Sequence, residues 1–177
     1  MVSAELIFSI NQIEINHLGV IFIKICSIDQ ATVKSGYAIF QDSKLSDYGL
    51  IDLHKNKNKE LRFDEMCFKL GELIQKEKPD KVIFEGVNLQ CAVSTLILLA
   101  QLQGVIIGVC QANHICYVIL KPTKWRKALQ FTQGRNVKRQ ELKQQAKDYV
   151  KKHFNKNVSE DEADAICIGQ SFLTKLI

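Results

Sequence analysis

The chain has 177 residues, and its 46% apolar content is enough for one domain with a sizeable core. None of its six cysteines forms a Cys-x-x-Cys pair, so neither a structural zinc site nor a disulfide framework is indicated. The N-terminus also lacks the basic start and cleavage site of a signal peptide. We therefore expect a cytoplasmic protein whose cysteines are small buried side chains.

The net charge of +5 is distributed unevenly along the chain. Residues 121–156 contain twelve Lys and Arg against two acidic residues, a local charge of +10, and the remainder carries about −5. One interpretation is a solvated helix face. The other is a surface that binds DNA or RNA, because each neutralised phosphate releases condensed counterions.

The first half of the chain predicts three strands, a helix and a fourth strand. Runs rich in Ile, Val and Phe, at 20–28, 35–40 and 48–53, predict a three-strand meander. Apolar residues recur at helical spacing from Phe63 to Ile74, and Pro79 ends that helix before a strand begins at Val82. Residues 1–19 fit this plan poorly and are either an added edge strand or a mobile extension, so the expected domain is 20–177.

Between Gly86 and Ile115 the chain has no Asp, Glu, Lys or Arg, so a transmembrane helix has to be considered. Four glutamines interrupt the segment, and Gly104 predicts a split into a helix at 92–103 and a short strand or helix end at 105–109. We expect no membrane contact. The helix at 92–103 is then either ordinary core or a dimer interface too apolar to leave in water.

The rest of the chain predicts a fifth strand at 117–120 and helices at about 122–129 and 137–152. A last helix begins near Ser159, which forms a capping-box signature with Glu162. Three antiparallel strands followed by strand–helix alternation indicate an α/β fold, with a mixed five-stranded sheet and helices on both faces.

Four acidic residues stand where these elements end or begin. Asp29 ends the first strand and Glu85 the fourth, and the last helix opens with Asp161 and Asp164, three residues apart on one helical face. Each has a structural interpretation, since Asp29 suits a turn and Asp161 a helix N-terminus. Glu85, however, follows a run that belongs in mid-sheet, where a carboxylate needs a cation or hydrogen-bond partner.

Four carboxylates without a neighbouring His or Cys favour Mg²⁺, with Mn²⁺ as the alternative. Two such ions about 4 Å apart activate a water and stabilise the leaving oxygen in an in-line phosphoryl displacement. The four acids, Asp29, Glu85, Asp161 and Asp164, therefore predict a nuclease site with two metal ions.

Three motifs resemble those of the RuvC family of Holliday-junction resolvases. The segment 27–39 is similar to the first motif, in which a strand-ending Asp precedes a small-residue turn and a Gly-Tyr strand. Residues 82–87 look like the second, and Asp161-Glu162-Ala163-Asp164-Ala165 looks like the closing Asp-x-Ala-Asp-Ala. The resemblance implies a ribonuclease H-like fold, a homodimer, paired incisions of a four-way DNA junction, and metal ligation by the four acids.

Basic residues beside the acids are a feature of RuvC-type enzymes, and the resemblance suggests Lys121 and Lys138 as further catalytic residues. Trp125 either stacks on an exposed base or, at helical spacing with Leu129, anchors the core. The full set of expected DNA-binding residues is Lys121, Lys124, Trp125, Arg126, Lys127, Arg135, Lys138, Arg139 and Asn88.

The chain departs from the usual family pattern at three places, one of which is the segment Trp125-Arg126-Lys127. Gln30 and Ala31 replace a Pro-Gly pair, and Asn88 stands where bacterial members carry an aromatic residue that stacks at the junction centre. These features look more like the divergent relatives of phages and prophages, which would act in the host cytoplasm. The leading hypothesis is a junction resolvase; the alternatives are a broader nuclease for flaps, forks and three-way junctions, and a DNA-structure-binding module that has lost catalysis.

Overall fold

The structure, a computed structural model, describes residues 23–87 and 92–174, so the expected N-terminal extension and Asn88 lie outside the described residues. Its sheet has the order β3-β2-β1-β4-β5. β1 pairs with β2 and β2 with β3 in antiparallel fashion, whereas β4 is parallel to both β1 and β5. The expected meander followed by parallel strands is confirmed. The strands are β1 (Lys24–Asp29), β2 (Lys34–Gln41), β3 (Lys44–Asp52), β4 (Lys81–Glu85) and β5 (Cys116–Leu120).

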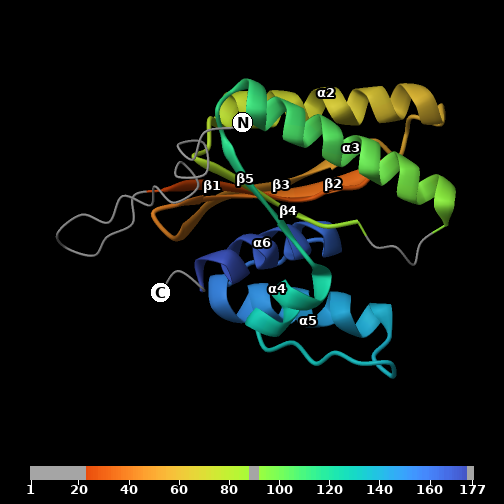
Figure 1. Cartoon of the computed structure of the whole chain (residues 1–177). Coiled ribbons are helices and arrows are strands. Elements are labelled where there is room, and N and C mark those ends of the chain that lie inside the picture. Colours follow the sequence, from red (N-terminus) through yellow and green to blue (C-terminus); the bar gives the residue numbers. More distant parts are fainter. Residues whose placement is uncertain (1–22, 88–91, 175–177) are drawn as a thin grey trace, which may run out of the picture.

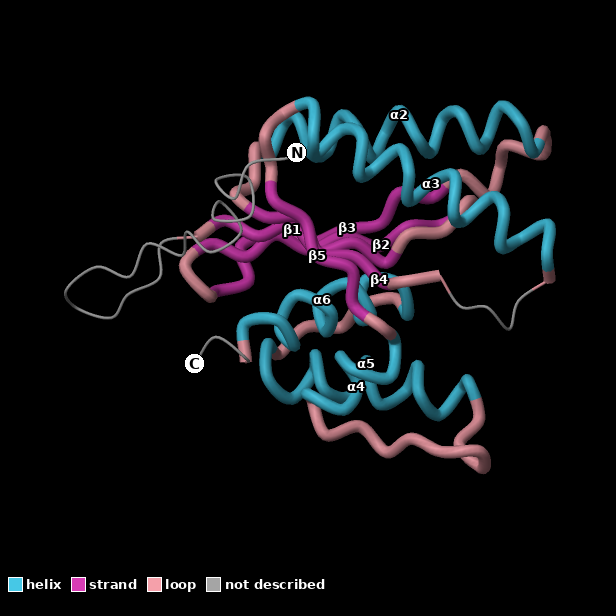
Figure 2. The backbone as a smooth tube through the Cα atoms, viewed as in Figure 1, coloured by secondary structure: helices cyan, strands magenta, loops and turns pink. Residues whose placement is uncertain are grey.

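Helices cover both faces of the sheet, as the fold class requires. α2 (Lys59–Glu77) and α3 (Val93–Ala112) lie on one face. α4 (Pro122–Ala128), α5 (Arg139–Phe154) and α6 (Glu160–Leu173) lie on the other, with the strands running between the two layers (Figures 1 and 2). α6 is the central helix of its layer, because it contacts β1, β2 and β4 as well as α5.

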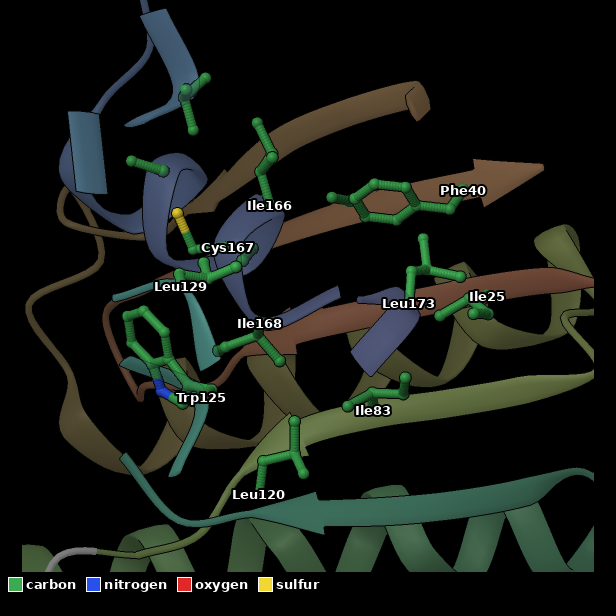
Figure 3. Close-up of a cluster of buried hydrophobic side chains, with 14 of the residues drawn as sticks. Ile25, Phe40, Ile83, Leu120, Trp125, Leu129, Ile166, Cys167, Ile168 and Leu173 are labelled. Atoms are coloured by element: carbon green, nitrogen blue, oxygen red, sulfur yellow. The ribbon is translucent and has the colours of Figure 1, made fainter. Parts of the chain in front are cut away.

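The period-two alternation of strand side chains divides the core into two clusters. In β1, Ile25 faces α6 while Cys26 and Ile28 pack toward α2 and α3. In β4, Ile83 faces α6, whereas Val82 and Phe84 face the other layer. Figure 3 shows the α6 side of this core, with Ile25 and Ile83 beneath Ile168 and Leu173. The alternation continues to the strand ends and directs Asp29 and Glu85 toward α6.

Ser159 caps α6 as the sequence predicts. Its hydroxyl accepts a hydrogen bond from the Glu162 amide, and the Glu162 carboxylate accepts one from the Ser159 amide, which completes the capping box. The start of α6 is therefore fixed one residue after Ser159. Asp161 and Asp164 consequently lie in its first turns.

The expected break at Gly104 is wrong, because α3 runs as one helix from Val93 to Ala112. An interior glycine costs a helix about 1 kcal/mol, which the packing of its apolar neighbours offsets. Leu102, Ile106 and Cys110 form the buried stripe that supplies this packing. A Cβ at Gly104 would meet nothing within 4 Å, so this glycine lies on the open side of the helix.

α3 is also the one helix in the described residues that is long and apolar enough to cross a membrane, with a mean hydropathy of 2.0. Only 17% of that apolar stretch is buried within the chain, and Val93 and Ile97 are largely exposed. Length and composition alone are weak evidence for a span, because helices of soluble proteins pass the same test. What the helix does establish is a wide apolar surface on the α2–α3 side of the molecule.

Candidate active site

The four predicted acids converge where β1 and β4 end beneath the start of α6. Ile28 pairs with Phe84 in the parallel register, so Asp29 and Glu85 are the next residues on neighbouring strands. Gly36 of β2 pairs with Asp29 on its other side. A Cβ at Gly36 would lie 2.0 Å from the Asp161 carbonyl oxygen, so only a glycine lets α6 approach the sheet this closely.

The acids differ in burial, and burial governs their ionisation. The exposed fraction of the side chain rises from 7% for Asp164 to 17% for Asp29, 22% for Glu85 and 29% for Asp161. Burial raises the pKa of Asp29 well above its ordinary value, and the neighbouring Asp164 raises it further. Burial also raises the pKa of Glu85 and of Asp164. The cluster as a whole therefore favours the binding of a cation.

Lys143 of α5 provides one such cation, and the sequence reasoning missed it. Its ammonium lies 2.6 Å from Asp164, 3.4 Å from Asp161 and 3.8 Å from Asp29. Burial lowers the pKa of Lys143, but the carboxylates of Asp164 and Asp29 more than offset this and raise it overall. The lysine therefore stays charged among the acids.

A signal for Lys143 was present in the sequence. The buried residues Ala146 and Val150 lie three and seven positions after Lys143, so the lysine belongs to the apolar face of α5. A lysine on such a face needs a buried acidic partner.

Glu85 has partners of its own on α4. The indole N–H of Trp125 donates a hydrogen bond of 2.7 Å to Glu85 Oε1, and the Arg126 guanidinium lies 3.8 Å from the same oxygen. Trp125 is 1% exposed, so the expectation that it anchors the core is confirmed. Its assignment as a DNA-binding residue that stacks on a base is wrong, because no face of the ring is open to a base; Figure 3 shows it beside Leu129 in the core.

Most of the other predicted basic residues are exposed near the site. The exposed residues are Lys121, Lys124, Lys127, Arg135, Lys138 and Arg139, which lie on α4, on the following connection and at the start of α5. Lys121 directly follows β5, the strand next to the one that carries Glu85. Within the described residues, the lysine that contacts the acids is Lys143 rather than Lys121 or Lys138.

The donors fit a hard divalent cation by chemistry and by charge. Four carboxylates face two cationic side chains, Lys143 and Arg126, so negative charge remains uncompensated. No three His, Cys, Asp or Glu side chains of residues 23–87 and 92–174 are close enough to hold a metal ion as they stand. The side chains that could hold a divalent ion here are the carboxylates of Asp29, Glu85, Asp161 and Asp164, because hard cations prefer oxygen donors.

A mixed sheet with acids at the ends of two parallel strands, facing two more at the start of a helix, is the arrangement that the sequence analysis expected for a ribonuclease H-like nuclease. The family model for crossover junction endodeoxyribonuclease RuvC matches residues 25–171. The chain belongs to this family: it is an endodeoxyribonuclease that resolves Holliday junctions, and membership implies dependence on a divalent metal.

Individual relatives agree with this assignment. The RuvC endonuclease of Brachyspira hyodysenteriae is 27% identical over 146 residues, which cover 80% of this chain and 88% of that protein. RuvC of Thermus thermophilus in complex with a Holliday junction superposes with a TM-score of 0.69 at 12% identity, over 86% of this chain and 93% of the other. The Fowlpox virus resolvase with its junction DNA gives 0.63 at 19% identity, over 88% and 99%. The structural likenesses show the shared fold.

Proposed function

We propose that Asp29, Glu85, Asp161 and Asp164 bind two Mg²⁺ ions and form the hydrolytic site with which this chain makes paired incisions in four-way DNA junctions. The observation that supports this most directly is the convergence of three of these carboxylates, those of Asp29, Asp161 and Asp164, around one buried lysine. Divalent ions bound there supply an activated water and a stabilised leaving oxygen for an in-line displacement. Mn²⁺ suits the same oxygen donors.

In this proposal Lys143 has one role in the metal-free site and another in the metal-bound site. Without metal, its ammonium compensates Asp164 and keeps the acidic residues together. If a metal were bound, the Lys143 ammonium on α5 would offer positive charge beside the acids, where the scissile phosphate would lie. The residue thus takes the role that the sequence analysis gave to Lys121 and Lys138.

The exposed basic residues form the DNA-binding surface of the proposal. Lys121, Lys124 and Lys127 follow β5 directly, and Arg135, Lys138 and Arg139 lead into the helix that carries Lys143. Their positive charge compensates DNA phosphates on either side of the scissile bond, and this binding weakens as the salt concentration rises. Arg126 is not part of this surface, because its guanidinium lies 3.8 Å from the Glu85 carboxylate.

The apolar surface of α3 supports a homodimer. Val93 is 71% exposed and Ile97 is 52% exposed, and both lie near the start of the helix, whereas its buried residues Leu102, Ile106 and Cys110 lie in its middle and C-terminal part. Paired incisions need two active sites, and a symmetric interface between two copies supplies them. We propose that α3 packs against its counterpart in a second chain.

Substrate choice can be tested with labelled DNA. The purified protein is incubated with four-way junctions, three-way junctions, forks and flaps in Mg²⁺ and, separately, in Mn²⁺. We expect symmetric, paired incision of the four-way junction at a rate well above those of the other substrates. Equal rates on all four substrates would support the broader branched-DNA nuclease, and junction binding without incision in either metal would contradict a catalytic role for the site.

A further inference from the structure

Glu85 is held by hydrogen bonds to its main chain as well as to its carboxylate. Its backbone carbonyl accepts hydrogen bonds from the side-chain amides of Gln30, at 2.5 Å, and Gln103, at 2.7 Å. The next amide, of Gly86, donates to the Leu120 carbonyl at 2.8 Å, which ties the end of β4 to β5. The main chain at Glu85 is thus fixed from three directions, and only its side-chain torsions remain free.

Trp125 fixes those torsions. The indole has a single polar group, an N–H that only donates, and a buried donor of this kind needs an acceptor. Here the acceptor is Oε1 of Glu85 at 2.7 Å. One carboxylate oxygen is therefore aimed at α4, and the orientation of the whole carboxylate follows from the position of the indole.

The indole itself has little freedom to move. The ring is 1% exposed, and Phe131 packs against it edge-on with ring centroids 5.7 Å apart. The Arg126 guanidinium lies 4.7 Å from the ring centroid. The position of the N–H is therefore set by the core of α4 and by no part of the DNA-facing surface.

We infer that Trp125 is a positioning residue, whose indole N–H holds the Glu85 carboxylate in the orientation that ligates the divalent metal. This inference rests on the metal site of the proposed function. A hydrogen bond from a neighbouring residue to a metal ligand commonly changes metal affinity by about 10- to 100-fold. Because Trp125 is the only tryptophan of the chain, its fluorescence also reports on the state of Glu85.

The test replaces the N–H while leaving the shape of the ring. The full chain is produced with β-(3-benzothienyl)alanine at position 125, in which sulfur takes the place of the indole N–H. Mg²⁺ affinity is measured by calorimetry, melting temperature is measured in chelator, and kcat and KM are measured on a four-way junction. We expect a Mg²⁺ affinity lowered about 10-fold or more, a lower kcat, an unchanged KM and a nearly unchanged melting temperature.

The matched control is Leu173→Ala, which loosens the same core cluster at the far end of α6, away from the indole and Glu85. It should lower the melting temperature and leave Mg²⁺ affinity as in the unmodified chain. An equal loss of Mg²⁺ affinity in Leu173→Ala would overturn the inference, because the effect would then belong to packing in general. Wild-type Mg²⁺ affinity in the sulfur isostere would overturn it as well.

A third variant separates this inference from the proposed function. In the unmodified chain we expect Mg²⁺ to change the fluorescence of Trp125. Glu85→Gln should weaken Mg²⁺ binding and abolish that change. If Glu85→Gln binds Mg²⁺ as tightly as the unmodified chain, the proposed metal site itself fails. If Glu85→Gln weakens binding and the isostere does not, only the role of Trp125 fails.

Discussion

Lys143 is the residue on which the electrostatics of the metal-free site depend. Its side chain is 10% exposed and contacts three carboxylates, whereas the other lysines named from the sequence are exposed. The four acids could be predicted, because the ends of two strands and the start of a helix can be inferred from the sequence. The lysine was harder to find, because its one sequence signal is its position three and seven residues before Ala146 and Val150 on the apolar face of α5.

Replacing Lys143 by Met should destabilise the metal-free chain by about 3 kcal/mol, because Asp164 would lose its buried partner. Incision activity should fall at the same time. Mg²⁺ should then raise the melting temperature of this variant more than that of the unmodified chain, since the metal replaces the missing charge. Thermal unfolding with and without Mg²⁺ measures this, and Lys151→Met on the exposed face of α5 is the matched control. An equal Mg²⁺ effect in all three proteins would contradict the role of Lys143.

Asp29→Asn should raise the stability of the metal-free chain. It should also abolish cleavage. The pKa of Asp29 is raised by burial, so the folded chain holds this proton more tightly than the unfolded chain does. The contribution of Asp29 to stability is therefore present at low pH and is lost as pH rises from the ordinary carboxyl range through the raised pKa. Removing the ionisation should raise the melting temperature, and by more at about pH 8 than at about pH 5. Calorimetric scans in chelator measure this, and a gain that shrinks with rising pH would contradict it.

At the scale of helices and strands, most elements could be predicted in type, because their apolar periodicity is strong. The capping box also located the start of α6 to within a residue. The break expected in α3 was the main error. Glycine ends a helix where the chain must change direction, but at Gly104 the apolar run continues on both sides and the packing of Leu102 and Ile106 keeps the helix intact.

Gly36→Ala should cost about 2 kcal/mol or more of stability and should also lower incision activity. The added Cβ meets backbone atoms of Asp161 and Glu162 at 2.9 Å or less, so α6 and its two acids would have to shift from the sheet. Gly71→Ala is the control, because its Cβ would have only an ordinary contact of 3.7 Å with Val109. That substitution within α2 should stabilise the chain by roughly 0.5–1 kcal/mol. Chemical denaturation measures both, and equal stability of the two variants would contradict the close approach.

At the scale of the whole molecule, the two faces of the sheet carry different surfaces. The acids at the ends of β1 and β4 face the α4–α6 layer, which carries the other two acids and the exposed basic residues, and the α2–α3 layer presents the apolar surface of α3. The proposed function therefore uses one side of the sheet for catalysis and the other for the proposed dimer contact.

Ile97→Glu should convert the proposed dimer to a monomer, because it places a charge on the exposed apolar surface of α3. Light scattering after gel filtration measures the mass in solution. The variant should keep Mg²⁺ binding and lose paired incision of junctions, whereas Ile97→Leu should remain dimeric and active. A dimeric Ile97→Glu protein would place the interface elsewhere.

The measurement that tests the central claim most directly is single-turnover cleavage of a labelled four-way junction, with binding followed separately. The unmodified chain should cleave both strands in Mg²⁺ and cleave neither in chelator. Glu85→Gln and Asp164→Asn should bind the junction as tightly as the unmodified chain and leave it uncut. Undiminished cleavage by either variant, or cleavage that persists in chelator, would contradict a metal-dependent site at these acids.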